Sequence, residues 1–215
     1  MKNSKLKFLL LSDIVGSRKI KERKKFEKRL EIILQQVSAQ YGDAFELPIR
    51  VWKGLDEMAA VIGKPWLLYN IMDAIASGIV PYQVRFVLVK GRVELLSEDK
   101  DVAKADGEAF PAAVAQMNML KKEGLYFTCD TGNSLFDQAW KTQVNLIRLI
   151  KKDWTEQQWL IYESYKSLAS QEAVGKKLKI TQQSVSKALR SIDAVQMIAI
   201  EKELESWTMA ELNKK

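Results

Sequence analysis

Apolar residues occur along the chain in two patterns: short continuous runs, and longer stretches with helical spacing. The run from Leu6 to Ser12 is short and continuous, which is typical of a buried strand. Between Lys19 and Tyr41 apolar residues recur every three or four positions, which predicts an amphipathic helix. Lysines and arginines occupy the other faces of this helix and indicate either a solvated surface or a patch that attracts phosphates.

The same patterns continue to residue 152 and predict a sheet with helices packed on it. Two hairpins are expected, one over 48–62 and one over 82–96 with its turn at Lys90 and Gly91. Further elements are expected as helices over 65–79, 108–124 and 135–152 and a strand over 125–130. This order predicts an α+β fold with a ferredoxin-like (cyclase-like), antiparallel or mixed sheet and helices on one face.

From Trp154 onward the pattern is helical throughout. We therefore expect two domains, an α+β domain over residues 1–152 and a small all-α domain over 153–215. The junction is a charged break at Lys152 and Asp153 without proline or glycine, which favours two domains held fairly rigidly.

Residues 170–192, SQEAVGKKLKITQQSVSKALRSI, have the spacing of a helix-turn-helix. Ser170 and Thr181 are placed to cap the two helices, and Gly175 lets the helices approach closely. In this motif the second helix enters the major groove of DNA. Lys179 departs from the usual pattern, because glycine or asparagine commonly occupies that turn position, where φ is often positive.

The outward face of the second helix carries polar and basic side chains that suit DNA. Gln and Ser near the start of a helix contact base edges, whereas Lys and Arg contact phosphates or guanine. We expect DNA contacts from Gln182, Gln183, Ser184, Ser186, Lys187 and Arg190, with Lys176 and Lys177 on the neighbouring surface. The structural alternative is a helical hairpin used for packing or dimerisation.

Composition narrows the classes of function. The net charge of +7 favours phosphate-bearing partners, although a solvated lysine-rich surface explains it equally well. Histidine is absent, which excludes histidine bases, histidine-containing zinc sites and Ser-His-Asp triads. The single cysteine, Cys129, cannot form an internal disulfide and is expected in the core. The first apolar run is too short for a signal sequence or a membrane span, so we expect a cytoplasmic protein without membrane contact.

Carboxylates follow the predicted strands at two places. Asp13 ends the first strand, and Asp56 and Glu57 follow the turn of the first hairpin. In a ferredoxin-like sheet these strands are neighbours, so the carboxylates would bind a divalent cation such as Mg²⁺ together with the phosphates of a nucleotide. The alternative gives them structural roles, with Asp13 closing a strand and Asp56 lying in a turn.

Four motifs, LLLSDIVGSRKI, VWKGLDEM, VRFVLVKGRV and ADGEAF, resemble successive motifs of the SatD family of bacterial proteins. Their order and approximate spacing agree over about residues 6–110, and the helix-turn-helix segment has the C-terminal placement found in many members. The resemblance implies a fold more than it implies a function.

The first two motifs also resemble, more distantly, those of class III nucleotide cyclases and GGDEF-type diguanylate cyclases. In those enzymes an Asp-Ile pair on the first strand binds Mg²⁺ and a second acid lies on the next hairpin. By this resemblance Asp13 and Ile14 match the first motif, and Asp56 or Glu57 matches the second. Leu55 interrupts the Gly-Asp-Glu run, and no Asn/Arg pair for a transition state is found. The resemblance therefore implies nucleotide or metal binding more than cyclisation.

Three hypotheses follow, and they belong to different classes of function. The first and favoured one is a DNA-binding transcriptional regulator, a homodimer whose cyclase-like domain senses a nucleotide or metal or only dimerises. The second is a Mg²⁺-dependent nucleotide enzyme of nucleotidyl cyclase type. The third is a scaffold whose helical tail binds another protein.

Overall fold

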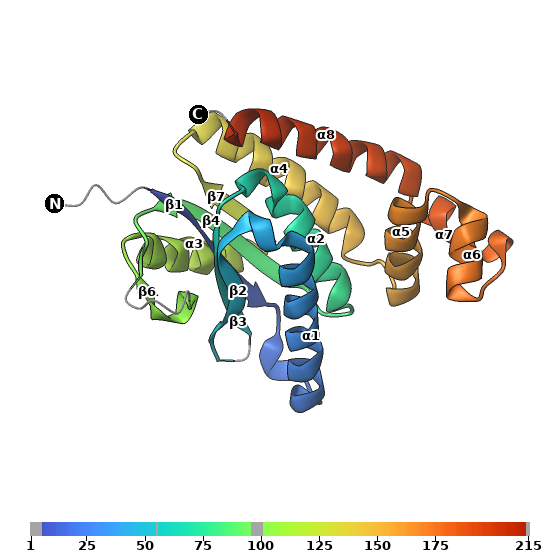
Figure 1. Ribbon diagram of the computed structural model, residues 1–215, viewed down its shortest axis with the longest axis horizontal. Coiled ribbons are helices and arrows are strands. Elements are labelled where there is room, and N and C mark those ends of the chain that lie inside the picture. The colour runs from blue at the N-terminus through green and yellow to red at the C-terminus, as the bar shows by residue number, and fades with distance from the viewer. Residues whose placement is uncertain (1–5, 55, 96–100, 214–215) are drawn as a thin grey trace.

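The computed structural model describes residues 6–54, 56–95 and 101–213 and confirms a mixed α+β fold (Figure 1). A five-stranded sheet has the strand order β2-β3-β1-β4-β7. Its strands are β1 (Lys7–Ile14), β2 (Phe45–Lys53), β3 (Glu57–Ile62), β4 (Val84–Gly91) and β7 (Phe127–Asp130). The central strand, β1, runs antiparallel to β3 and β4, whereas β4 and β7 are parallel.

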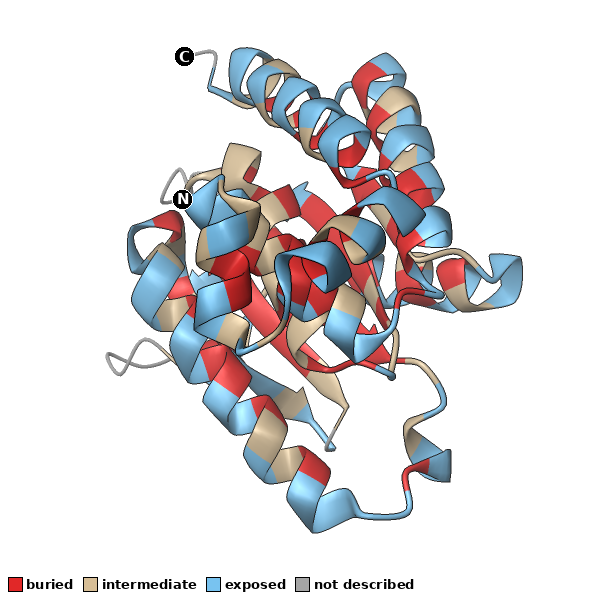
Figure 2. Ribbon diagram, turned by 90° about the vertical axis from the view of Figure 1, so that its right-hand side faces the viewer, coloured by how far each residue is buried: buried red, intermediate tan, exposed pale blue. Residues whose placement is uncertain are grey.

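Helices cover both faces of this sheet. They are α1 (Arg23–Tyr41), α2 (Leu68–Gly78) and α4 (Ser134–Lys151) on one face and α3 (Ala109–Glu123) on the other. In β1, Leu10 belongs to the first core, while Leu9 and Leu11 belong to the second. The expectation of helices on one face was wrong, because a strand that is apolar on both faces needs cover on both. Figure 2 shows the buried residues gathered in the sheet and on the inward sides of the helices.

The second predicted hairpin does not form. β4 continues through Gly91, which pairs with Lys7, and β5 (Glu94–Leu95) pairs instead with β6 (Ala105–Asp106) in a separate ribbon. A Cβ at Gly91 would lie 3.1 Å from the Cβ of Ala109 at the start of α3. This glycine therefore marks a close approach of helix and strand rather than a turn. Residue 96, the predicted end of the hairpin, lies outside the described residues.

The C-terminal segment is helical, as its pattern predicts. It consists of α5 (Glu156–Leu168), α6 (Gln171–Leu178), α7 (Gln182–Ser191) and α8 (Ala194–Leu212). In Figure 1, α8 runs back from α7 along α4, and the rings of Trp207 and Phe136 lie 4.7 Å apart between these two helices.

One hydrophobic core joins this helical segment to the sheet. Trp154 packs edge-on against Trp159 and Tyr162, with ring centroids 5.1 and 4.9 Å apart, and all three belong to the core that also contains Phe86 of β4. The break between α4 and α5 is short and lies at the predicted junction of residues 152 and 153. The division into two domains stays a prediction, but the two parts share apolar packing.

Among the helices that the structure describes, none combines the length and the apolar character that a membrane crossing requires.

Candidate functional site

The carboxylates predicted to form a metal site do lie together at one end of the sheet. In the register of the antiparallel strands, Asp13 of β1 stands opposite Glu57 of β3 and Arg85 of β4. Directly opposed residues of neighbouring strands project to the same face, so these three side chains share the face that α3 covers. Asp13, Ile14, Asp56 and Glu57 all line one cleft of about 720 Å³.

Each oxygen of the Asp13 carboxylate forms an ion pair with a basic side chain of the same chain. Lys121 of α3 places its Nζ 2.6 Å from Oδ1, and Arg85 places Nη1 3.5 Å from Oδ2. Asp13 is buried, whereas the Lys121 side chain is about one-third exposed to solvent. Lys121 and Arg85 thus supply the positive charge beside Asp13 that an added metal would otherwise supply.

The second acidic position is also engaged. The Oγ of Ser17 donates a hydrogen bond to Oδ2 of Asp56, and the backbone N–H of Ile14 donates to the carbonyl of Asp56 at 3.1 Å. Gly16, with φ of +69°, makes the turn that brings Ser17 to the hairpin. In the described part of the chain, no three Asp, Glu or Cys side chains converge closely enough to hold a metal ion. The magnesium assignment therefore stays a prediction.

The remaining walls of this cleft are rich in charge of both signs. Arg18, Lys19 and Arg23 line it beside the two cations of Asp13, and Glu27 lines it beside the other acids. Five cationic side chains thus face four carboxylates across the cleft. This mixture suits an anionic or zwitterionic ligand better than an apolar one.

The α6–α7 pair has the local geometry that its sequence predicts. Ser170 accepts a hydrogen bond from the N–H of Ala173, and Thr181 accepts one from the N–H of Ser184, so each residue caps its helix. Lys179 takes the left-handed conformation, with φ of 56°, and ends α6. A Cβ at Gly175 would lie 2.9 Å from the carbonyl oxygen of Ile180, so only glycine permits this close turn.

Most of the predicted DNA-contacting residues are exposed to solvent. The exposed residues are Gln182, Gln183, Ser184, Lys187, Arg190, Lys176 and Lys177, while Ser186 is half-buried. The Ser184 hydroxyl is shared with that of Thr181 at 2.8 Å, and Lys176 pairs with Glu172 at 2.7 Å. Lys187 makes no ion pair with any residue that the structure describes. The face therefore combines amide groups with free positive charge.

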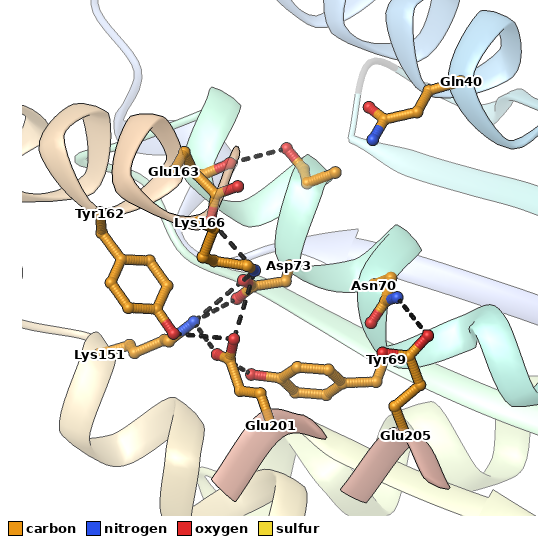
Figure 3. A network of polar contacts seen from close by, with 12 residues as sticks. Gln40, Tyr69, Asn70, Asp73, Lys151, Tyr162, Glu163, Lys166, Glu201 and Glu205 are labelled. Carbon is orange, nitrogen blue, oxygen red and sulfur yellow. Dashed lines mark hydrogen bonds and ion pairs between the residues drawn. The ribbon is translucent and has the colours of Figure 1, made fainter. Parts of the chain in front are cut away.

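A buried ionic cluster that the sequence analysis did not identify connects two helices on the sheet, α2 and α4, to the C-terminal helices α5 and α8 (Figure 3). The side chain of Lys151, at the end of α4, is fully buried, and its ammonium lies 2.9 Å from both carboxylate oxygens of Asp73 in α2. It also contacts Oε1 of Glu201 in α8. The hydroxyls of Tyr69 and Tyr162 donate to Glu201 at 2.7 and 2.8 Å.

Lys166 of α5 completes this cluster from its solvent side. Its ammonium lies 3.3 Å from Glu201 and 3.5 Å from both Asp73 and Glu163. Burial lowers the pKa of Lys166, but the three carboxylates outweigh burial and raise it. Burial raises the pKa of Asp73, but Lys151 and Lys166 outweigh this effect and lower it. These two groups, Asp73 and Lys166, are therefore held in their charged forms.

The cluster forms the floor of a cavity of about 700 Å³ between α1, α2, α5 and α8. Figure 3 shows Gln40 and Asn70 on the walls of this region and Glu205 bonded to Asn70. Burial, followed by Asp73, raises the pKa of Glu163 on the same wall. The walls of this cavity therefore come from helices of both parts of the chain.

A recognisable pattern marks these missed residues. Each is a charged residue on the apolar face of a helix: Asp73 within LLYNIMDAIASG, Lys151 following Val144, Ile147 and the buried Arg148, and Glu201 between Met197 and Leu204. An ionisable group at such a position is buried and needs a partner. Cys129 is buried as expected, and burial raises the pKa of its thiol.

Comparison with known proteins gives a protein family and several similar solved structures. The model of the SatD family matches residues 8–203. Two solved chains, both described as the structure of a bacterial light-regulated adenylyl cyclase, have TM-scores of 0.44 and 0.43 at 15% and 16% identity. The matches cover 60% and 59% of this chain, and 44% and 76% of those chains. The chain thus spans less than half the length of the first. A search of curated proteins found no significant match.

The ionic cluster predicts a large effect of one substitution. Lys151→Met should lower the free energy of unfolding by about 3–5 kcal/mol, because it leaves buried carboxylates without their main counter-charge. The neighbouring Lys152 is exposed, so Lys152→Met should change the stability by less than about 0.5 kcal/mol. Urea unfolding followed by circular dichroism measures both. Equal stability of the two variants would show that the cluster does not hold the helices together.

The tyrosines of the cluster predict loss of stability in alkali. Burial, with Asp73 and Glu201, raises the pKa of Tyr69 well above 10.0, and burial with Glu201 raises that of Tyr162. Above about pH 10 the unfolded tyrosines lose protons that the folded ones keep, so the free energy of unfolding should fall as the pH rises.

The contribution of Tyr69 to this alkaline loss can be isolated. Tyr69→Phe should make the fall shallower by up to about 1.4 kcal/mol per pH unit, because one titrating group is removed. Urea unfolding between about pH 9 and pH 11.5 gives the two curves. Parallel curves for the wild type and the variant would contradict the assignment.

Proposed function

The chain belongs to the SatD family, and from that premise we propose that it is a DNA-binding transcriptional regulator. In this proposal α6 and α7 form the helix-turn-helix, with α7 as the recognition helix. The sheet domain serves ligand sensing or dimerisation. The observation that carries the proposal is the exposed face of α7, where Gln182, Gln183, Lys187 and Arg190 stand together.

The electrostatics of the α6–α7 segment support binding to a phosphate backbone. Lys176, Lys177, Lys179, Lys187 and Arg190 lie between residues 170 and 192, and Glu172 is the only acid there. Lys176 neutralises Glu172. The remaining cations meet no local carboxylate, so their charge is available to phosphates.

The order of residues on α7 supports base contact at its first turn. Gln182 and Gln183 are the first two residues of the helix, and glutamine recognises adenine through two hydrogen bonds. Lys187 and Arg190 lie one and two turns later, where phosphate contacts would fix the orientation of the helix. Val185 and Leu189 face the core and hold α7 against α6.

We infer further that β1, α1, β2, β3, α2 and β4 form a ferredoxin-like unit to which α3, β7 and α4 are added. The order β2-β3-β1-β4 with antiparallel neighbours supports this assignment. Such a unit places the ends of β1 and β3 side by side, where the cleft of Asp13 lies.

A second candidate function rests on that cleft. Asp13, Asp56 and Glu57 share it with several arginines and lysines, which suits Mg²⁺ with a nucleotide in a protein of nucleotidyl cyclase type. Asp13 and either Asp56 or Glu57 would supply carboxylate oxygens, and the carbonyl of Ile14 a further ligand. Lys121 and Arg85 would have to release Asp13, which makes this the less favoured function.

The DNA-binding proposal predicts the effect of a charge reversal on α7. Lys187→Glu with Arg190→Glu should weaken binding to genomic DNA fragments by about 100-fold or more, because two phosphate or base contacts become repulsive. Lys24→Glu with Lys28→Glu makes the same change of charge on the exposed face of α1 and should cost much less. Fluorescence anisotropy at two salt concentrations measures the affinities. Equal losses in both variants would show that only net charge matters.

Sequence-specific binding can be tested separately. Selection of bound fragments from genomic DNA, with and without nucleotides, should enrich a common site in the wild type. Failure to enrich any site would favour the enzyme or the protein-binding scaffold.

The cleft predicts a second, independent result. Asp13→Asn should abolish any Mg²⁺-dependent rise in melting temperature with ATP or GTP, because it removes a carboxylate charge from the predicted metal site. The exposed Asp43→Asn serves as the control. An identical shift in Asp13→Asn and wild type would remove Asp13 from the site, and turnover of labelled nucleotide by the wild type would favour the enzyme.

A further inference from the structure

The cavity of about 700 Å³ between α1, α2, α5 and α8 has the opposite charge balance from the cleft of Asp13. Its walls carry more carboxylates than ammonium groups, even when the buried ammonium of Lys151 beneath them is included. The carboxylates are Asp73, Glu163, Glu201 and Glu205, and the lysines that line the cavity are Lys166 and Lys202. Negative charge is therefore in excess here, although the whole chain carries a net charge of +7.

Two of these carboxylates lack a close counter-charge, and Glu163 is the first. The ammonium of Lys151 contacts Asp73 and Glu201 directly. Among the described residues, the ion-pair partner of Glu163 is Lys166 at 3.5 Å, and this lysine divides its charge among three carboxylates. Burial and then Asp73 raise the pKa of Glu163, as expected for a carboxyl group that is short of positive charge nearby.

Glu205 is the second carboxylate without a counter-charge. It accepts a hydrogen bond from the amide of Asn70 at 3.2 Å and forms no ion pair in the part of the chain that the structure describes. Burial raises the pKa of Tyr41, Lys166 lowers it, and Glu163 and Glu205 both raise it further. Both carboxylates therefore act on one hydroxyl, and Figure 3 shows them on different sides of the ionic cluster. A single small ligand could contact both.

The remaining walls of the cavity include aliphatic side chains, contributed by Ile33, Val37, Ala74, Val195 and Ile198. Carboxylates bind ammonium groups through strong, charge-assisted hydrogen bonds, and methylene chains pack on aliphatic surface. The volume lies within the range of small-molecule pockets, about 300–1,000 Å³.

We propose that this cavity binds a linear aliphatic diamine, with one ammonium group at Glu163 and the other at Glu205. The methylene chain between the two groups lies against the aliphatic walls. This site is separate from the cleft of Asp13, which has an excess of cations. It does not rest on the DNA-binding proposal, because α7 does not line the cavity.

Isothermal titration calorimetry of the full chain with putrescine and cadaverine, at fixed pH and ionic strength, tests the proposal. At least one of them should bind at one site per chain, with a dissociation constant of about 1 mM or lower. Butylamine, with one ammonium group, should bind at least about tenfold more weakly, because one charge-assisted contact is lost. The neutral diol of the same length as putrescine should not bind.

Variants of the walls locate the site. Glu163→Gln and Glu205→Gln should each weaken the binding at least about tenfold, because each removes a carboxylate charge and nearly keeps the side-chain shape. The Glu163 side chain is 37% exposed, so the first variant should fold. Glu203→Gln makes the same change of charge at an exposed position of α8 outside the cavity and should leave the affinity unchanged. Ala74→Leu should abolish binding by filling the cavity, without any change of charge.

Several results would overturn the proposal. They are absence of diamine binding up to about 10 mM, equal binding of the diol, unchanged affinity in both Glu163→Gln and Glu205→Gln, or an equal loss in Glu203→Gln. Diamine binding that Ala74→Leu leaves intact would place the ligand outside the cavity and would also contradict the proposal. Circular dichroism of each variant before titration separates a loss of binding from a loss of folding. The affinities for DNA are measured independently, so either proposal can fail while the other stands.

Discussion

The arrangement of the whole chain depends on the ammonium group of Lys151. It is fully buried, and it lies between Asp73 of α2 and Glu201 of α8. Removing such a charge from water costs several kcal/mol, which only close counter-charges and hydrogen bonds offset. Both carboxylates must therefore be in place for α4 to end where it does, and α2, α4 and α8 are fixed relative to one another. Lys151 also lies in the last turn of α4, where the helix dipole favours a cation.

This constraint determines how the α6–α7 pair is presented. α5 carries Tyr162 and Lys166 to the same cluster, and α8 carries Glu201, so the helices before and after α6–α7 are both anchored there. The outer face of α7 keeps a set direction relative to the sheet as a result. The cavity above the cluster has walls from α1 and α2 on one side and α5 and α8 on the other. The cavity is therefore lined both by helices that pack on the sheet and by the helices that flank α6–α7.

Helix caps and turn conformations could be predicted from the sequence, because they depend on neighbouring residues. Features that depend on residues far apart in the sequence could not. The caps at Ser170 and Thr181, the positive φ of Lys179 and the need for Gly175 depend on residues within one or two turns, and all four are present. The continuous apolar run of β1 requires a helix on each face of the sheet. The prediction that helices cover only one face did not take this run into account. The sequence analysis expected a turn at Gly91, because glycine is common in turns. Glycine is also common where a helix approaches a strand closely, and only the position of α3 shows that Gly91 is such a case.

The site around Asp13 shows where sequence analysis reaches its limit. Spacing along two strands was enough to bring Asp13, Asp56 and Glu57 into one cleft, because antiparallel register follows from the hairpin and the central strand. The cations that pair with Asp13 are distant from it in the sequence, since Arg85 comes from β4 and Lys121 from the far end of α3. A metal ion and a lysine ammonium stabilise the same ionised carboxylate, so the acids alone do not distinguish a metal site from an ion-paired one. Lys121, about one-third exposed and on a helix rather than in the sheet, is the cation that a ligand could displace at least cost. The balance between a structural and a ligand-binding role for Asp13 therefore depends on the strength of its ion pairs with Lys121 and Arg85.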